Sequence, residues 1–153
     1  MTRLPRRAML NLALATPALM LTARPGFAAE PEIYSEGGIA IDGSDTVAYF
    51  AGNGPVSGGA GATVEYKGTT WRFANAANAD QFAADPEAFA PQFGGYCAYA
   101  ASLGYLAPTV PEAWTLHNGQ LFLNASLRAR QLWLRDIDGN IAKGRANWPG
   151  ILG

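Results

Sequence analysis

The residue best suited to chemistry is Cys97, the only cysteine in the chain, which follows Gly94 and Gly95 at the start of a predicted helix. Main-chain N–H groups at a helix start stabilise a thiolate. Cys97 can therefore serve a Cu(I) site of two or three ligands, a redox-sensitive thiol or a mixed disulfide. Free cysteine is also a common buried residue that packs as a small apolar group. The sequence leaves both roles open, and Gly94 and Gly95 form a structural pivot in either case.

Three further polar residues are candidates for ligand or metal binding, and each has a structural alternative. Asp45 can ligate a metal or cap a turn through its own backbone. Gln92, just ahead of the glycine pair, can orient a bound group or tie down the loop backbone. His117, the only histidine, lies beside an Asn-Gly turn, where a side chain is usually exposed and alone. Trp71 and Trp114 are predicted to be core residues rather than an aromatic binding box.

Enzymatic motifs are weakly represented. A nucleophilic triad built on Cys97 would need a histidine partner, and His117 is the only one in the chain. The sequence has no nucleotide-binding glycine loop and no pair of histidines at metal-binding spacing. An enzyme is therefore a less favoured class than a binding module.

Two β-hairpins must position these residues. Residues 63–73 alternate apolar and polar side chains around a Lys67-Gly68 turn, and residues 113–124 do so around Asn118-Gly119. A short strand and turn are expected at 39–43, a buried segment at 44–50, and a glycine-rich loop at 51–62.

Short helices are expected between and after the hairpins, from their capping residues. Asn75 begins a helix that runs to Ala84, Asp85 begins the next, and Ser126 begins a third. Residues 96–103 form a helix that Gly104 ends, and a last helix covers 137–148. The fold class that follows is α+β, a small single domain with two β-hairpins and short helices packed around them.

The first 28 residues have the composition of a cleaved export signal. Basic residues precede an apolar run, which is followed by small residues ending at Ala28. Arg6 and Arg7 are typical of a twin-arginine signal, although an ordinary secretory signal with two chance arginines is the alternative. The expected product is periplasmic or secreted, with no stable membrane span after cleavage. Residues 29–38 would then form an N-terminal arm, and residues 39–153 the domain.

Charge narrows the range of partners. Removal of residues 1–28 takes away four arginines and leaves 7 of the 11 basic residues against all 12 acids, a net charge of −5. No basic patch survives, so nucleic acid is not expected as a partner. A single cysteine also excludes an internal disulfide, so the apolar core must supply the stability.

The order and spacing of these motifs resemble those of exported YHS-domain proteins. The resemblance covers nearly the whole of the chain after residue 28. It is carried by Ile41 to Phe50, by Trp71-Arg72-Phe73 through Gln81-Phe82 and Asp85-Pro86-Glu87 to Gly94-Gly95-Tyr96-Cys97-Ala98, and by Leu121 to Asn124 with Trp133 and Asn147-Trp148-Pro149 behind them.

This resemblance implies a treble-clef-like YHS core with a C-terminal helical extension. It also implies three metal-binding cysteines, as in the forms attached to heavy-metal transporters. Ala48, Ala74 and Asn78 occupy those positions here, so all three thiolates are lacking. One cysteine and one histidine do not supply the converging sulfur or imidazole ligands that such a site requires.

Three functional hypotheses follow. The first is an exported YHS-like binding module that takes a metal ion, such as copper or another transition metal, or a small ligand between the Asp45 segment and the Gly94–Cys97 turn. The second is a structural or interaction protein with no small-molecule site. The third is a thiol-redox protein or enzyme that uses Cys97. The oligomeric state is left open.

Overall fold

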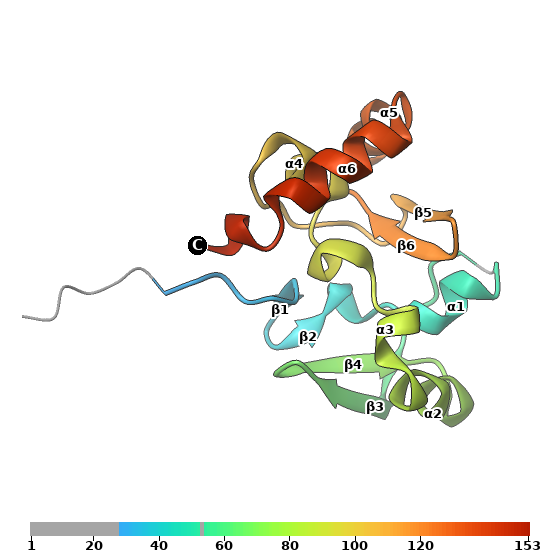
Figure 1. The fold of residues 1–153 in the computed structure, drawn as a ribbon. Coiled ribbons are helices and arrows are strands. Elements are labelled where there is room, and N and C mark those ends of the chain that lie inside the picture. Colours follow the sequence, from blue (N-terminus) through green and yellow to red (C-terminus); the bar gives the residue numbers. More distant parts are fainter. Residues whose placement is uncertain (1–27, 53) are drawn as a thin grey trace, which may run out of the picture.

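A computed structural model describes residues 28–52 and 54–153, so the predicted export signal lies outside the described residues apart from Ala28 (Figure 1). The strands are β1 (Ser35–Glu36), β2 (Ile39–Ala40), β3 (Gly59–Tyr66), β4 (Thr69–Phe73), β5 (Trp114–His117) and β6 (Gln120–Leu123). The α-helices are α1 (Thr46–Phe50), α2 (Ala76–Ala84), α3 (Pro86–Phe89), α4 (Ala98–Leu103), α5 (Leu127–Leu134) and α6 (Ile137–Asn147). Short 3₁₀ turns are η1 (Ile41–Gly43), η2 (Gln92–Gly95) and η3 (Gly150–Leu152). The predicted α+β class is confirmed.

A mixed four-stranded sheet contains the first predicted hairpin. Strands β3 and β4 pair antiparallel around Lys67 and Gly68, which both have positive φ, as the hairpin turn requires. The strand order is β1-β2-β4-β3, because β2 pairs parallel to β4 and β1 pairs antiparallel to β2. The sequence predicted this hairpin and a short strand at 39–43, but it did not predict that β1 and β2 extend the hairpin into a four-stranded sheet.

Strand β3 forms one edge of this sheet and begins earlier than predicted. It starts at Gly59, inside the segment expected to be a loop through Ala62. The pairing register with β4 shifts between Gly59 and Thr63, so the strand is irregular in its first half. A glycine-rich strand of this kind lacks the side chains that would have marked it as a strand in the sequence.

The second hairpin separates two hydrophobic cores. Strands β5 and β6 meet at Asn118 and Gly119, with φ of 51° and 73°, which confirms the predicted Asn-Gly hairpin. Along β6, Leu121 and Leu123 belong to the core of the sheet, whereas Phe122 packs with Trp133 at 5.0 Å between ring centroids. The alternation of a β-strand thus places one side of β6 against each core. In Figure 1 this hairpin lies between the four-stranded sheet and the α4–α6 helices.

The predicted capping residues begin their helices as expected. Asn75 accepts a hydrogen bond from the amide of Asn78 at 2.8 Å, and Asp85 and Ser126 cap α3 and α5 in the same way. Gly104, with φ of 92°, ends α4. Of the helices in the described ranges, none has the length and apolar character needed to cross a lipid bilayer.

Aromatic side chains dominate the core beside the sheet. Trp71 is fully buried and lies 5.0 Å from Phe82, which in turn lies 5.1 Å from Phe73, measured between ring centroids. Trp114 is half-buried and packs on Tyr49 at 5.4 Å. Trp71 is therefore a core residue, whereas Trp114 packs at the edge of the core and also borders a cavity.

Candidate functional site

Asp45 lies at the start of α1 and is fully buried. One carboxylate oxygen accepts the main-chain N–H groups of Val47 at 2.9 Å and Ala48 at 3.2 Å. The other accepts the main-chain N–H of Ala74 at 2.9 Å and the side-chain amide of Asn78 at 2.8 Å. The chain's own donors therefore use both oxygens, and the carboxylate ties α1 to the end of β4 and the start of α2.

The three positions that the YHS resemblance assigns to metal-binding cysteines meet around this carboxylate. Ala48 and Ala74 direct main-chain N–H groups toward Asp45, and Asn78 directs a side-chain N–H. A metal ion needs lone pairs directed at it, whereas these groups supply hydrogen-bond donors to an anion. Within the described residues, no three His, Cys, Asp or Glu side chains are grouped so that they could hold a metal ion. The residues present do not fit a metal of the transporter type.

Cys97 is 2% exposed and caps α4. Its sulfur accepts the N–H of Ala100 at 3.4 Å, and its S–H donates to Oδ1 of Asn124 at 3.4 Å. The same oxygen accepts the N–H of Tyr99 at 2.9 Å, so Asn124 joins the end of β6 to the start of α4. Asn124 is fully buried and was not singled out by sequence reasoning. The thiol is thus a packed hydrogen-bond donor in this structure.

Gln92 and His117 lie in separate neighbourhoods. Gln92 lines a polar cavity of about 350 Å³ together with Lys67, whose Nζ lies 2.5 Å from Oε1 of Glu32. His117 lies at the end of β5, where its Nε2 is 2.9 Å from Oδ1 of Asp138. The contact of His117 is with a carboxylate of the chain itself, and Gln92 lies beside an ion pair of the chain, so neither neighbourhood indicates a bound metal.

The four predicted ligand residues do not meet in any of the three main cavities of the described residues. Three cavities among the described residues are lined without Asp45, Cys97 or His117, and Gln92 lines only the polar one of the three. The expected pocket between the Asp45 segment and the Gly94–Cys97 turn is therefore not among these three.

The glycine pair of η2 lets the N-terminal segment pack against the turn. Gly94 and Gly95 both have positive φ, at 62° and 84°. A Cβ on Gly94 would overlap the main-chain oxygen of Glu32, so only glycine fits there. The N–H of Tyr34 donates to the Gly94 oxygen at 2.9 Å, which fixes the segment along η2. This close approach brings Tyr34 beside Tyr96.

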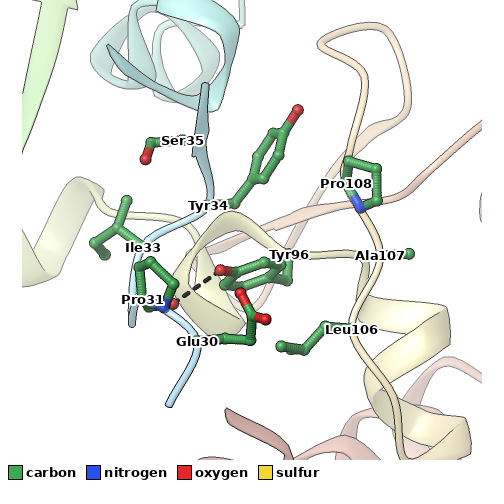
Figure 2. A pocket seen from close by; sticks show the side chains of 9 residues that line it. All are labelled: Glu30, Pro31, Ile33, Tyr34, Ser35, Tyr96, Leu106, Ala107 and Pro108. Atoms are coloured by element: carbon green, nitrogen blue, oxygen red, sulfur yellow. Dashed lines mark hydrogen bonds between the residues drawn. The ribbon is translucent and has the colours of Figure 1, made fainter. Parts of the chain in front are cut away.

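A cleft opens where these two tyrosines meet, and we call it the tyrosine cleft (Figure 2). It has a volume of about 360 Å³ and is lined by Glu30, Pro31, Ile33, Tyr34, Ser35, Tyr96, Leu106, Ala107 and Pro108. The two rings lie 5.8 Å apart between centroids and are tilted by 55°. They are only 7% and 8% exposed, so packing holds them in place and a ligand would meet only the parts that border the cleft. The hydroxyl of Tyr96 donates to the Pro31 oxygen at 2.8 Å.

Carboxylates surround the hydroxyl of Tyr34. It lies 3.2 Å from Oδ1 of Asp42 and 3.4 Å from Oε1 of Glu36. Burial and these two neighbouring carboxylates raise the pKa of Tyr34 above its ordinary value. Burial also raises the pKa of Asp42, with smaller contributions from the negative charges of Glu36 and Glu112. Tyr34 is therefore a neutral hydrogen-bond donor over the physiological pH range.

Tyr96 has a similar electrostatic environment. Burial, and then the negative charge of Glu30, raise the pKa of its hydroxyl above the ordinary value. Within residues 28–52 and 54–153, Glu30 is the only charged residue that lines the tyrosine cleft. The cleft therefore combines neutral aromatic rings with negative charge.

No protein-family model, curated protein or solved structure matches the chain. A function can therefore be proposed from the fold, its cavities and the sequence motifs. The class that they define is a small α+β domain with a surface cleft between its N-terminal segment and the loop that follows α4. Sequence reasoning missed Tyr34, because it lies in the 29–38 segment, where no pattern allowed a structural assignment.

Proposed function

We propose that this chain is an exported YHS-like binding module that takes a small ligand in the tyrosine cleft. The observation that carries the proposal is an opening of about 360 Å³ with two rigid tyrosine rings on its walls. Ligand sites in proteins are typically clefts of this size, lined by aromatic and apolar groups with few polar ones. By contrast, the polar atoms of Asp45 and Cys97 are occupied by hydrogen bonds within the chain.

Sequence motifs support the family and the compartment in this proposal. The segment from Ile41 to Phe50 and the run that ends at Cys97-Ala98 resemble exported YHS-domain proteins in order and spacing. Residues 1–28 have the composition of an export signal, with Arg6 and Arg7 in the twin-arginine arrangement.

Replacement of both arginines by lysine is expected to leave the protein in the cytoplasm. Unchanged export of this variant would remove the twin-arginine interpretation.

The test of the cleft is a titration of the purified, isotope-labelled protein with a panel of small cationic, neutral and anionic compounds, followed by NMR. Compounds that bind are expected to shift the amide signals of Ile33, Ser35 and Ala107, which border the cleft. Tyr96→Leu removes one ring and is expected to abolish these shifts. A panel in which every binder shifts other amides, or in which nothing binds, would overturn the cleft as the functional site.

A metal-binding module is the competing version of this function. It would use Cys97 and bind copper or another transition metal. The protein is purified without chelator, as the native chain and as Cys97→Ser, and its metal content is measured by elemental analysis. If the native protein holds a stoichiometric metal and Cys97→Ser does not, the functional site is a metal site at Cys97 and not the tyrosine cleft.

A further inference from the structure

We infer that the tyrosine cleft binds a small organic cation, of the quaternary ammonium or protonated alkylamine class. This inference rests on the proposed function, because it names the ligand class of the same cleft. Three features of the cleft support it: the acidic side chains around it, the hydrogen bonding and tilt of its two tyrosine rings, and its apolar walls.

The charged side chains described around the cleft are acidic. Among the residues that the structure describes, Glu30 is the only charged one that lines the cleft, and its side chain is exposed. Figure 2 shows the Glu30 carboxylate beside the ring of Tyr96. Behind the second ring, Asp42 and Glu36 lie within 3.4 Å of the Tyr34 hydroxyl. Like charges repel an anionic ligand, so this arrangement selects for neutral or positive molecules.

The hydrogen bonding and the orientation of the two aromatic rings favour the binding of a cation. Both hydroxyls donate hydrogen bonds to acceptors of the chain itself, Tyr96 to the Pro31 oxygen and Tyr34 to Asp42. Donation to an acceptor increases the electron density of a phenol ring, which strengthens its attraction for a cation. The rings are tilted by 55°, so they offer two differently oriented surfaces rather than one stacking plane. Aromatic surfaces of this kind recognise quaternary ammonium groups by cation–π attraction.

The remaining walls suit the methyl groups of such a cation. Leu106, Ala107 and Pro108 line the opposite side and present apolar surface (Figure 2). Ca²⁺ or Mg²⁺ would find too few oxygen ligands here, because these ions take six or more. An alkylammonium group is better matched, since its charge is spread over carbon-bound surface that tolerates loss of water.

Choline and its neutral carbon isostere 3,3-dimethyl-1-butanol provide the test, because they share a shape and differ in charge. Each is titrated into the purified protein by calorimetry, with the amide signals of Ile33, Ser35 and Ala107 monitored by NMR. We expect choline to bind at least roughly fivefold more tightly than the isostere. Equal affinity of the two compounds, or tighter binding of the isostere, would overturn the inference.

Three variants separate the cation inference from a general loss of the cleft. Glu30→Gln removes the charge at an exposed side chain and is expected to weaken choline severalfold, with no change for the isostere. Tyr96→Leu is expected to abolish binding of choline. Tyr96→Phe keeps the ring, and we expect it to bind choline within about threefold of the native protein. If Glu30→Gln and Tyr96→Leu both leave choline affinity unchanged, the cation is bound elsewhere and the inference is wrong.

Failure of the cation inference is distinguishable from failure of the proposed function. If the isostere binds in the cleft as tightly as choline, the cleft is a ligand site and only its charge preference is wrong. If neither compound shifts the cleft amides, the cation inference fails, and the broader compound panel then decides whether the cleft binds ligands at all.

Discussion

Replacement of Asp45 by asparagine tests whether this carboxylate is the tie between α1, β4 and α2. Each carboxylate oxygen accepts two N–H donors, and asparagine keeps only one oxygen. In the variant an NH₂ group would face two of those donors, and it cannot accept hydrogen bonds from them. A hydrogen bond to a buried charged group contributes ~1.5–3 kcal/mol. Loss of two such bonds is therefore expected to lower the free energy of unfolding by about 3–6 kcal/mol.

Urea unfolding followed by tryptophan fluorescence measures this loss, with far-UV circular dichroism as a check that the variant is folded. A matched control is Asp136→Asn, because Asp136 also caps a helix but is exposed and makes one such bond, to the N–H of Gly139. Asparagine caps helices as well as aspartate does, so the control should change stability by less than ~0.5 kcal/mol. A similar small loss for Asp45→Asn, below about 1 kcal/mol, would refute the reasoning.

A double-mutant cycle sharpens the result. Asn78 donates to Asp45 at 2.8 Å, so Asn78→Ala should cost ~1–2 kcal/mol in the native protein and clearly less in the Asp45→Asn background. Equal costs in the two backgrounds would mean that the two side chains do not interact in solution.

Three further predictions concern other parts of the fold. Gly94→Ala is expected to prevent stable folding, because its Cβ would overlap a main-chain oxygen. The control is Gly104→Ala, where the nearest atom to the new Cβ is 3.8 Å away and the expected cost is ~1–2 kcal/mol. Similar urea midpoints for the two variants would contradict this prediction. The thiol of Cys97, at 2% exposure, should react with a thiol reagent only after unfolding, and rapid stoichiometric labelling of the native protein would show that it is not packed. Burial raises the pKa of Tyr34 above its ordinary value and that of Tyr49 to about 12, from ~10 in an unfolded chain. The stability that these groups contribute is therefore complete below pH ~10 and falls as the pH rises toward 12. The free energy of unfolding should be lower at pH ~11 than at pH ~9. Equal values at the two pH values would contradict this prediction.

Elements with local signals could be predicted from the sequence. Asn75 accepts a hydrogen bond from an amide three residues later, and Asp85 and Ser126 do the same for their helices. The turn at Asn118 and Gly119 likewise depends on the backbone preferences of those two residues. Such motifs are complete within a few residues, so no knowledge of the rest of the fold is needed to recognise them.

Pairing between distant segments could not be predicted. Strands β1 and β2 contain two residues each, which is too short for any alternation to be detected. The parallel pair of β2 and β4 has a single register partner, Ile39 with Thr70, so its formation depends on the tertiary structure. The four-stranded sheet was therefore out of reach of a pattern-based prediction.

The candidate site shows the same division between local and distant contacts. A capping role for Asp45 could be proposed from its place before α1, but its bonds to Ala74 and Asn78 join segments that meet only in the fold. Tyr34 and Tyr96 meet because the glycine pair of η2 lets the N-terminal segment approach. Neither residue type nor spacing in the sequence indicates that these two rings form one cleft.

The irregular start of β3 has a consequence for how molecules of this protein meet each other. An edge strand exposes unpaired main-chain groups, and a long flat edge promotes aggregation by pairing with another molecule. Here the register shift interrupts the edge between Gly59 and Thr63, leaving a short regular stretch up to Tyr66 that carries the exposed charge of Glu65. Bulges and charges of this kind oppose edge-to-edge association. The glycines that hid this strand from sequence-based prediction thus also disfavour the pairing of β3 with a strand of another molecule.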